Sequence, residues 1–198
     1  MSELSEEHVV TIRPAEYLQQ GLTHCGAYSV KAILSAYGVD DSTDPCDLYV
    51  SRWARILGIG IGRDYWGQVF RAHGIDVQNK SAVECNDTEK IFLLKRLLTQ
   101  NTPVMIRIGN GYATDKYNPL LGRIIGHWIT LWGYDGEAFY VYDSGLRRKF
   151  WNPSLPIGNT IRTSEEILRD WKFGKLQAWY WPFSGRENYQ YFSVSSRY

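Results

Sequence analysis

Cys25 combines a nucleophilic side chain with a position that activates it. It stands where an apolar pattern of helical spacing begins, with Ala27, Val30 and Leu34 on one face and Gly38 as the stop. The unsatisfied N–H groups and the positive dipole end of a helix start favour a thiolate over a thiol. Because the thiolate is the nucleophilic form, the spacing predicts a reactive cysteine at this position.

A nucleophilic cysteine also needs a base and a group that orients the base. Residues 126–145 read as two apolar and aromatic strands joined at Asp135-Gly136, which is a strong hairpin signal. His127 opens the first strand and Asp143 closes the second. Since the chain reverses at a tight turn, we expect the hairpin to bring the imidazole and the carboxylate together.

Together these residues resemble the papain-like cysteine peptidases, most closely their C39-like, bacteriocin-processing branch. The shared features are Gln19, five intervening residues and Cys25-Gly26, then a Gly-His strand, a Gly-Tyr-Asp-Gly turn and the terminal Asp143. The resemblance spans roughly residues 15–145. It implies Cys25 as nucleophile and His127 as general base and acid. It also implies Asp143 as the orienter of His127, and Gln19 as an oxyanion-hole donor beside the Cys25 backbone N–H.

Two positions depart from that branch. His24 stands where an Asp often precedes the cysteine, a change that could alter substrate contacts or thiolate tuning. Ser144 stands where a Pro commonly follows the terminal Asp, a change expected only in a loop. Gln20 is an adjacent candidate for the oxyanion donor, and Gln19 is preferred because its spacing matches the family. The last fifty or so residues carry no family signature.

The elements around these residues predict an α+β protein, with helices first and an antiparallel sheet after them. Periodicity and capping residues predict helices at 47–57, 64–73, 87–100 and 163–171, and strands at 9–12, 75–77, 104–108 and 176–181. Four apolar residues of the 47–57 helix are expected to face inward, namely Leu48, Trp53, Ile56 and Leu57. The segment 109–122 is expected to be a loop that shapes the cleft or leads away from it, and 184–198 a polar tail.

The resemblance implies a papain-like fold, in which an N-terminal helical part with the nucleophile helix packs on a C-terminal antiparallel sheet. We expect one domain over 1–198, mainly helical in 1–100 and mainly sheet in 101–198. A chain of 198 residues, 44% of them hydrophobic and 22% charged, is long enough to bury one core.

Composition also limits the partners. The formal net charge is +1, so nothing electrostatic points to nucleic acid or to an anionic membrane. No apolar run approaches the roughly 18 residues of a membrane span, and the acidic, polar start is unlike a signal peptide. We therefore expect a cytoplasmic protein, unless another route exports it. The expected partner is a peptide or protein substrate, or a small amide or acyl donor.

The three cysteines do not indicate a disulfide framework or a metal site. Cys25, Cys46 and Cys85 are odd in number and widely spread, which fits a reduced compartment. Cys46 and Cys85 are interpreted as structural or incidental. No Cys-x-x-Cys or His-x3-His spacing favours zinc, and the expected chemistry requires neither a metal nor an organic cofactor.

The sequence thus predicts a cysteine hydrolase that cleaves a peptide or amide bond through an acyl-enzyme thioester. Acyltransferases, transglutaminase-like enzymes and glutamine deamidases share that intermediate, so they stay open as alternatives. A further alternative is a catalytically silent module whose aromatic cleft binds a peptide or a carbohydrate. The motif leaves substrate preference and oligomeric state open.

Overall fold

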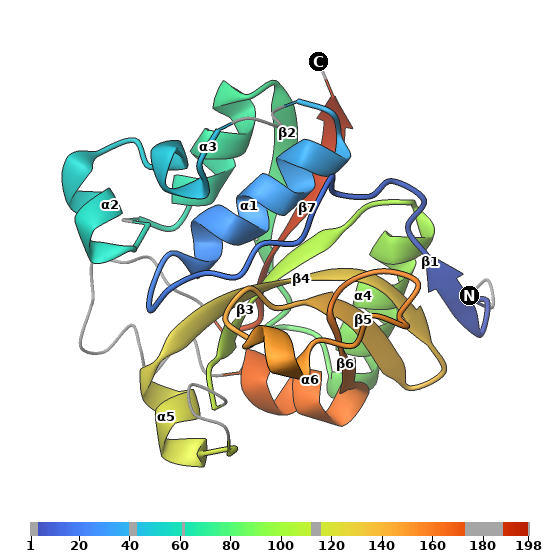
Figure 1. The fold of residues 1–198 in the computed structure, drawn as a ribbon. Coiled ribbons are helices and arrows are strands. Elements are labelled where there is room, and N and C mark those ends of the chain that lie inside the picture. The colour runs from blue at the N-terminus through green and yellow to red at the C-terminus, as the bar shows by residue number, and fades with distance from the viewer. Residues whose placement is uncertain (1–3, 40–42, 61, 112–115, 173–187, 198) are drawn as a thin grey trace.

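The fold comes from a computed structural model that describes residues 4–39, 43–60, 62–111, 116–172 and 188–197 (Figure 1). The α-helices are α1 (Cys25–Ala36), α2 (Arg52–Leu57), α3 (Tyr65–Ala72), α4 (Asp87–Thr99), α5 (Pro119–Ile124) and α6 (Ser164–Trp171). Short 3-10 helices are η1 (Pro45–Leu48) and η2 (Arg148–Phe150). The strands are β1 (Glu7–Val9), β2 (Ile75–Ser81), β3 (Val104–Gly109), β4 (Gly126–Asp135), β5 (Ala138–Tyr142), β6 (Thr160–Thr163) and β7 (Gln190–Arg197).

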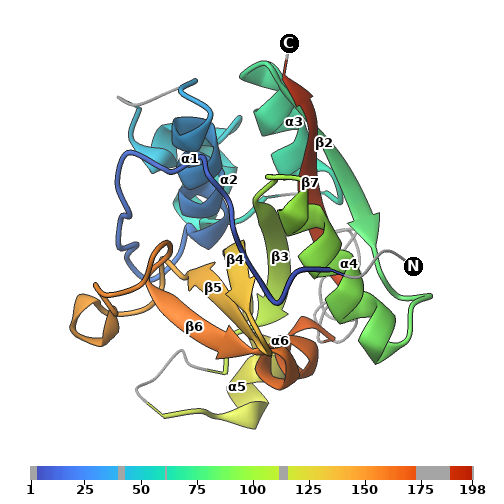
Figure 2. The same ribbon diagram turned by 90° about the vertical axis from the view of Figure 1, so that its right-hand side faces the viewer.

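The strands form one antiparallel sheet in the order β2-β7-β3-β4-β5-β6. On one edge β4 pairs with β5, and on the other it pairs first with β3 and then, over its last residues, with β1. Helix α1 lies on one side of the sheet and α4 on the other (Figure 2). This mixture of helices and an antiparallel sheet confirms the predicted α+β class.

Several helix boundaries agree with the sequence prediction to within one residue. Helix α1 begins at Cys25 as predicted, and α3 ends just before Gly74, whose φ is +74°. Asn86 caps α4 and Thr163 caps α6, each through a reciprocal capping box with a Glu three residues later. The hairpin is also confirmed, with its turn displaced by one residue, because Asp135 still pairs with Ala138.

The helix predicted at 47–57 is wrong in its extent and its buried face. Ser51 has an extended backbone and caps α2 by accepting from the Ala54 N–H. The predicted helix is therefore divided into η1 and α2. Only Leu48 of the four residues expected inward is buried. The exposed ones are Trp53, Ile56 and Leu57.

Three further expectations need correction. The first strand lies at Glu7–Val9 and not at 9–12, and the end of the loop predicted at 109–122 is the start of helix α5. The tail expected to be polar holds β7, an inner strand between β2 and β3. The strand predicted at 176–181 lies outside the described residues.

The described core is a single cluster of buried apolar residues. Its largest fully buried side chains are aromatic, including Trp132, Trp171, Tyr134 and Tyr142. These rings are therefore core residues. It stays a prediction that residues 1–198 form one domain with a mainly helical part in 1–100 and a mainly sheet part in 101–198. Within the described ranges, no helix has both the length and the apolar character needed to cross a bilayer.

Candidate active site

Cys25 lies at the first position of α1 and is partly exposed. The preceding residue, His24, has a left-handed backbone with φ of +79° and makes no side-chain cap. The first-turn N–H groups of α1 therefore receive no side-chain oxygen from the cap position. In this position the helix start favours a negative charge on the sulfur.

The surroundings of Cys25 favour its thiolate. Burial by itself raises the pKa of the thiol, but the charge of His127 and a hydrogen bond from its ring act in the opposite direction. Backbone hydrogen bonds from Trp128 and Gly26 add to this effect. Together they hold the pKa of Cys25 below its ordinary value, and the structure brings Cys25 and His127 within hydrogen-bond reach of each other.

His127 and Asp143 meet as the hairpin reading predicts. His127 is the second residue of β4, Asp143 follows β5 directly, and the two strands pair along their length. The His127 Nε2 lies 2.7 Å from Asp143 Oδ1, with both side chains buried. Since Asp143 occupies Nε2, Nδ1 is the ring nitrogen that remains for Cys25.

The imidazole is held as a cation. Burial disfavours its charge, but Asp143 and then Cys25 more than offset this and raise the pKa of His127 to about 10. Burial likewise raises the pKa of Asp143, whereas the charges of His127 and Arg162 lower it well below its usual range. The order Asp143, His127, Cys25 thus favours the charged form of each group over its neutral form.

Asp143 is fixed by residues that sequence reasoning missed. Arg162, buried on β6, donates from Nη2 to Asp143 Oδ2 at 2.7 Å, and the Gly145 N–H donates to Oδ1 at 3.0 Å. Asn159 accepts from the Asp143 N–H and donates to its carbonyl, both at 2.9 Å. No local signal marks Arg162 or Asn159, because their burial depends on how β6 and its preceding loop meet β5.

The two glutamines lie near the loop that follows Asp143. Gln19 is exposed, and its Oε1 accepts from the Arg148 N–H at 3.2 Å. Gln20 accepts from Ser144 Oγ at 2.6 Å through its own Oε1, and its N–H donates to the Ser144 carbonyl. Ser144 therefore ties the segment before the cysteine to the segment after Asp143.

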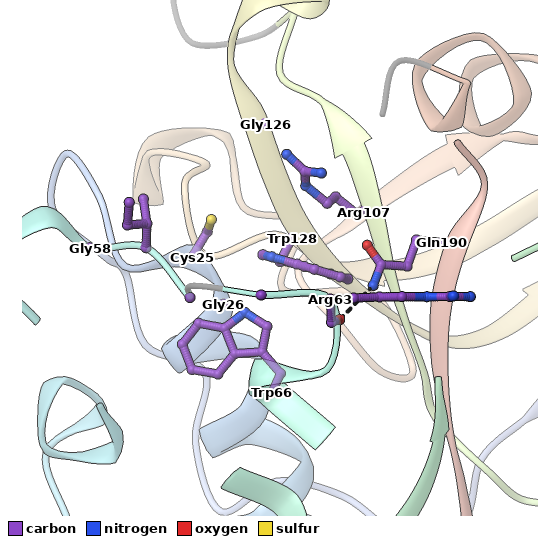
Figure 3. A pocket seen from close by; sticks show the side chains of 12 residues that line it. Cys25, Gly26, Gly58, Arg63, Trp66, Arg107, Gly126, Trp128 and Gln190 are labelled. Atoms are coloured by element: carbon purple, nitrogen blue, oxygen red, sulfur yellow. Dashed lines mark hydrogen bonds between the residues drawn. The ribbon is translucent and has the colours of Figure 1, made fainter. Parts of the chain in front are cut away.

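A cavity of about 170 Å³ opens beside the thiol (Figure 3). Trp66 and Trp128 line it, and Gly26 lies so close to Trp66 that a side chain on this glycine would collide with the indole. A side chain on Gly60 would collide with the Tyr65 ring. Among the described residues, no group of three or more His, Cys, Asp or Glu side chains is arranged to hold a metal ion.

The solved structures that match this chain include two peptidase structures. A structure assigned to a C39-like peptidase from Bacillus anthracis has a TM-score of 0.56 at 14% identity, covering 98% of this chain and 99% of that one. A double glycine motif protease from an AMS/PCAT transporter, solved in complex with the leader peptide, has a TM-score of 0.44 at 17% identity, covering 96% and 99%. No family model and no curated protein sequence matches the chain. The first likeness confirms a C39-like, papain-like peptidase fold.

Proposed function

We propose that this chain, which has the fold of C39-like peptidases, is a cysteine hydrolase that cleaves a peptide or amide bond. The observation that carries the proposal is the buried 2.7 Å hydrogen bond between His127 Nε2 and Asp143 Oδ1, with Cys25 hydrogen-bonded to the same imidazole. A nucleophile, a base and an orienting carboxylate in this order are the parts that acyl transfer through a thioester requires.

In the first half of the reaction, the Cys25 thiolate attacks the substrate carbonyl carbon and forms a C–S bond. The carbonyl oxygen becomes an oxyanion in the tetrahedral intermediate. When the intermediate collapses, the C–N bond breaks and the His127 imidazolium gives its proton to the leaving amine. Asp143 keeps the ring in position and stabilises its charge.

In the second half, His127 is neutral and accepts a proton from water as that water attacks the thioester. The C–S bond then breaks, the acid product leaves, and the thiolate–imidazolium pair forms again. His127 is thus neutral when it must accept a proton from water, and it is protonated again before the next substrate is attacked.

Gln19 is the proposed side-chain donor to the oxyanion, beside the Cys25 backbone N–H. Its Oε1 accepts from the Arg148 N–H, which leaves the amide nitrogen as the donor end. Removal of one oxyanion-hole donor costs about 10² to 10³ in turnover in other enzymes. The backbone N–H of Cys25 adds the second donor, at the start of α1.

The test of the charge pair is the pH dependence of Cys25 alkylation by iodoacetamide, measured by peptide mass spectrometry. Wild-type Cys25 should react well below the ~8.5 pKa of an ordinary thiol. In His127→Ala the lowering charge is absent while burial still raises the pKa, so the reaction should require a more alkaline pH. Cys46, which is also free and partly exposed, is the internal reference. If wild-type Cys25 titrates like Cys46, the proposal fails.

The acceptor is tested with a peptide mixture in H₂¹⁸O, with Cys25→Ala as the control. A hydrolase should place one ¹⁸O atom in each new carboxylate, and Cys25→Ala should produce none of these products. Products that carry a new amide bond and no ¹⁸O would replace the hydrolase proposal by an acyltransferase of the same fold.

A further inference from the structure

The cavity beside Cys25 has a strongly one-sided charge. Its described lining includes two arginines, Arg63 and Arg107, and no Asp or Glu side chain. Its volume of about 170 Å³ is below the roughly 300 Å³ at which drug-sized sites begin, so it suits one side chain or one small group. The cavity therefore favours a small group that carries negative charge.

Arg107 is the charged residue of an otherwise uncharged strand. It lies in β3, whose six residues are all buried, and is itself 5% exposed. Figure 3 shows the Arg107 side chain extending from β3 past Trp128, along the wall of the cavity that also holds Cys25.

The opposite wall limits water around that guanidinium. Trp66, which is 3% exposed, lies against Gly26 and Gly60, while Trp128 faces Arg107 across the β3–β4 pairing. Two indoles replace much of the water that would screen a charge here. A carboxylate that enters is therefore held more strongly than at an open surface.

Gln190 provides a neutral acceptor in the same cavity. It is 2% exposed, and its Nε2 donates to the Arg63 carbonyl and to Asn79 Oδ1, both at 3.1 Å. These bonds fix the orientation of the carboxamide, and Figure 3 shows its oxygen on the Arg107 side. The oxygen suits a peptide N–H, whereas the Arg107 fork suits a carboxylate in a bidentate pair.

We propose that this cavity binds a carboxylate group of the substrate through Arg107, so that the preferred substrate carries an acidic group next to the bond that is cleaved. This specificity rests on the proposed hydrolase function, since Cys25 forms part of the same cavity lining. The carboxylate is either that of an Asp or Glu side chain or that of a chain end.

The test compares alkylation of Cys25 by iodoacetate and iodoacetamide, a carboxylate and its neutral carboxamide counterpart. Wild-type protein should favour iodoacetate, relative to iodoacetamide, by at least about 10-fold more than Arg107→Met does. The iodoacetamide rate removes differences in thiolate fraction, and any attraction by His127 is common to both proteins. Equal ratios in wild type and Arg107→Met would overturn the proposal.

Two further variants make this result specific. Arg123→Met removes an exposed arginine of α5 outside the cavity lining and should leave the ratio unchanged. Arg107→Lys keeps the charge but not the planar fork and should retain part of the preference. If Arg107→Met does not fold, as judged by near-UV circular dichroism, Arg107→Gln takes its place and should abolish the preference.

Cleavage assays then separate the two sources of the carboxylate. Paired peptides differ either by Glu against Gln beside the scissile bond or by a free acid against an amide at the C-terminus. If the protein prefers the acidic peptide in only one of the two pairs, and Arg107→Met loses that preference, that pair identifies the source of the carboxylate. The alkylation comparison needs no turnover, so a protein that selects iodoacetate but cleaves no peptide refutes the hydrolase proposal and not the carboxylate site.

Discussion

Asp143 has a separate partner for each of its two carboxylate oxygens. Oδ1 lies 2.7 Å from His127 Nε2, and Oδ2 accepts from Arg162 Nη2 at 2.7 Å. Arg162 also lies 3.4 Å from Asp170 Oδ2, so one buried guanidinium bridges two buried carboxylates. Arg162 thereby holds the carboxylate in the rotamer that faces the imidazole, which makes it a positioning residue.

Replacing Arg162 should therefore destabilise the protein. Arg162→Met leaves Asp143 and Asp170 with one less cation, and breaking a buried ion pair by removing one partner typically costs about 3–5 kcal/mol. We expect a loss of this size in the free energy of unfolding at neutral pH. Urea denaturation followed by tryptophan fluorescence measures it.

Arg55→Met is the matched control for Arg162. Arg55 pairs with Asp47 at 2.6 Å, but about half of each side chain is exposed, at 52% and 49%. Exposed pairs contribute at most about 1 kcal/mol, so this variant should lose little. An Arg162→Met protein as stable as Arg55→Met would show that the buried pair does not contribute as the geometry indicates.

At the scale of elements, the starts of α1 and α3 pack closely together because Gly26 has no side chain. Gly26 follows the nucleophile in α1, and a Cβ there would lie 2.3 Å from the Trp66 indole of α3. The absence of a side chain at Gly26 lets Trp66 cover the first turn of α1 and form one wall of the cavity. The position of the thiol and the shape of the cavity are thus set by the same contact.

Gly26→Ala should push these two helices apart. Overpacking of a filled core typically costs about 1–3 kcal/mol, and we expect that loss in the free energy of unfolding. Adding Trp66→Leu should remove part of the penalty, because the colliding ring atoms are gone, and the two changes should be non-additive by at least ~0.5 kcal/mol. Urea denaturation of the four proteins in the cycle measures the coupling.

The control for this cycle is Gly21→Ala. A Cβ on Gly21 would have no neighbour within 4 Å, so its stability should stay within about 0.5 kcal/mol of wild type. Strict additivity of Gly26→Ala and Trp66→Leu would mean that the two positions do not share a contact in solution.

The elements that the sequence predicted well are those specified by neighbouring residues. Asn86 and Thr163 are local capping signals that marked α4 and α6 correctly, and Asp135-Gly136 marked the hairpin with its turn one residue away. Strand β7 differs, because its place depends on pairing with β2 and β3, more than 80 residues away in the sequence. Its mixture of serines and aromatic residues has no clear period, so only the sheet identifies it.

The same distinction applies to the residues of the site. A motif marked Cys25, His127 and Asp143, and the structure brings them together. Arg107 and Arg162 carried no such mark, because an arginine in a short strand is ordinarily expected at the surface. Their burial follows from the register of β3 on β4 and of β5 on β6, which tertiary pairing decides.

At the scale of the whole molecule, the Cys25–His127 pair links folding to pH. In the unfolded chain the thiol titrates near ~8.5 and the imidazole near ~6.5. In the folded protein the pKa of Cys25 is lowered, and that of His127 is raised to about 10. A lowered pKa gives stability that is lost as pH falls through the folded value. A raised pKa gives stability that is lost as pH rises from the unfolded value to the folded one.

Between the folded pKa of Cys25 and pH ~8.5, these two contributions oppose each other in wild type. The unfolded thiol then holds one proton more than the folded thiolate, whereas the folded imidazolium holds one more than the unfolded imidazole. Cys25→Ser removes the first contribution and the part of the rise in the His127 pKa that comes from Cys25, while Asp143 still raises that pKa. Its free energy of unfolding, relative to that of wild type, should therefore fall with rising pH by up to about 1.4 kcal/mol per unit.

Urea denaturation of both proteins at closely spaced pH values measures this difference, and subtraction removes groups that titrate alike in the two. A difference that grows steadily up to pH ~8.5 and then levels off is the result expected for a thiolate in the folded state. A flat difference from pH 6.5 to 8.5 would mean that Cys25 keeps its proton on folding. In that case the nucleophile would have to be formed only after substrate binds, with His127 acting as a base toward a neutral thiol.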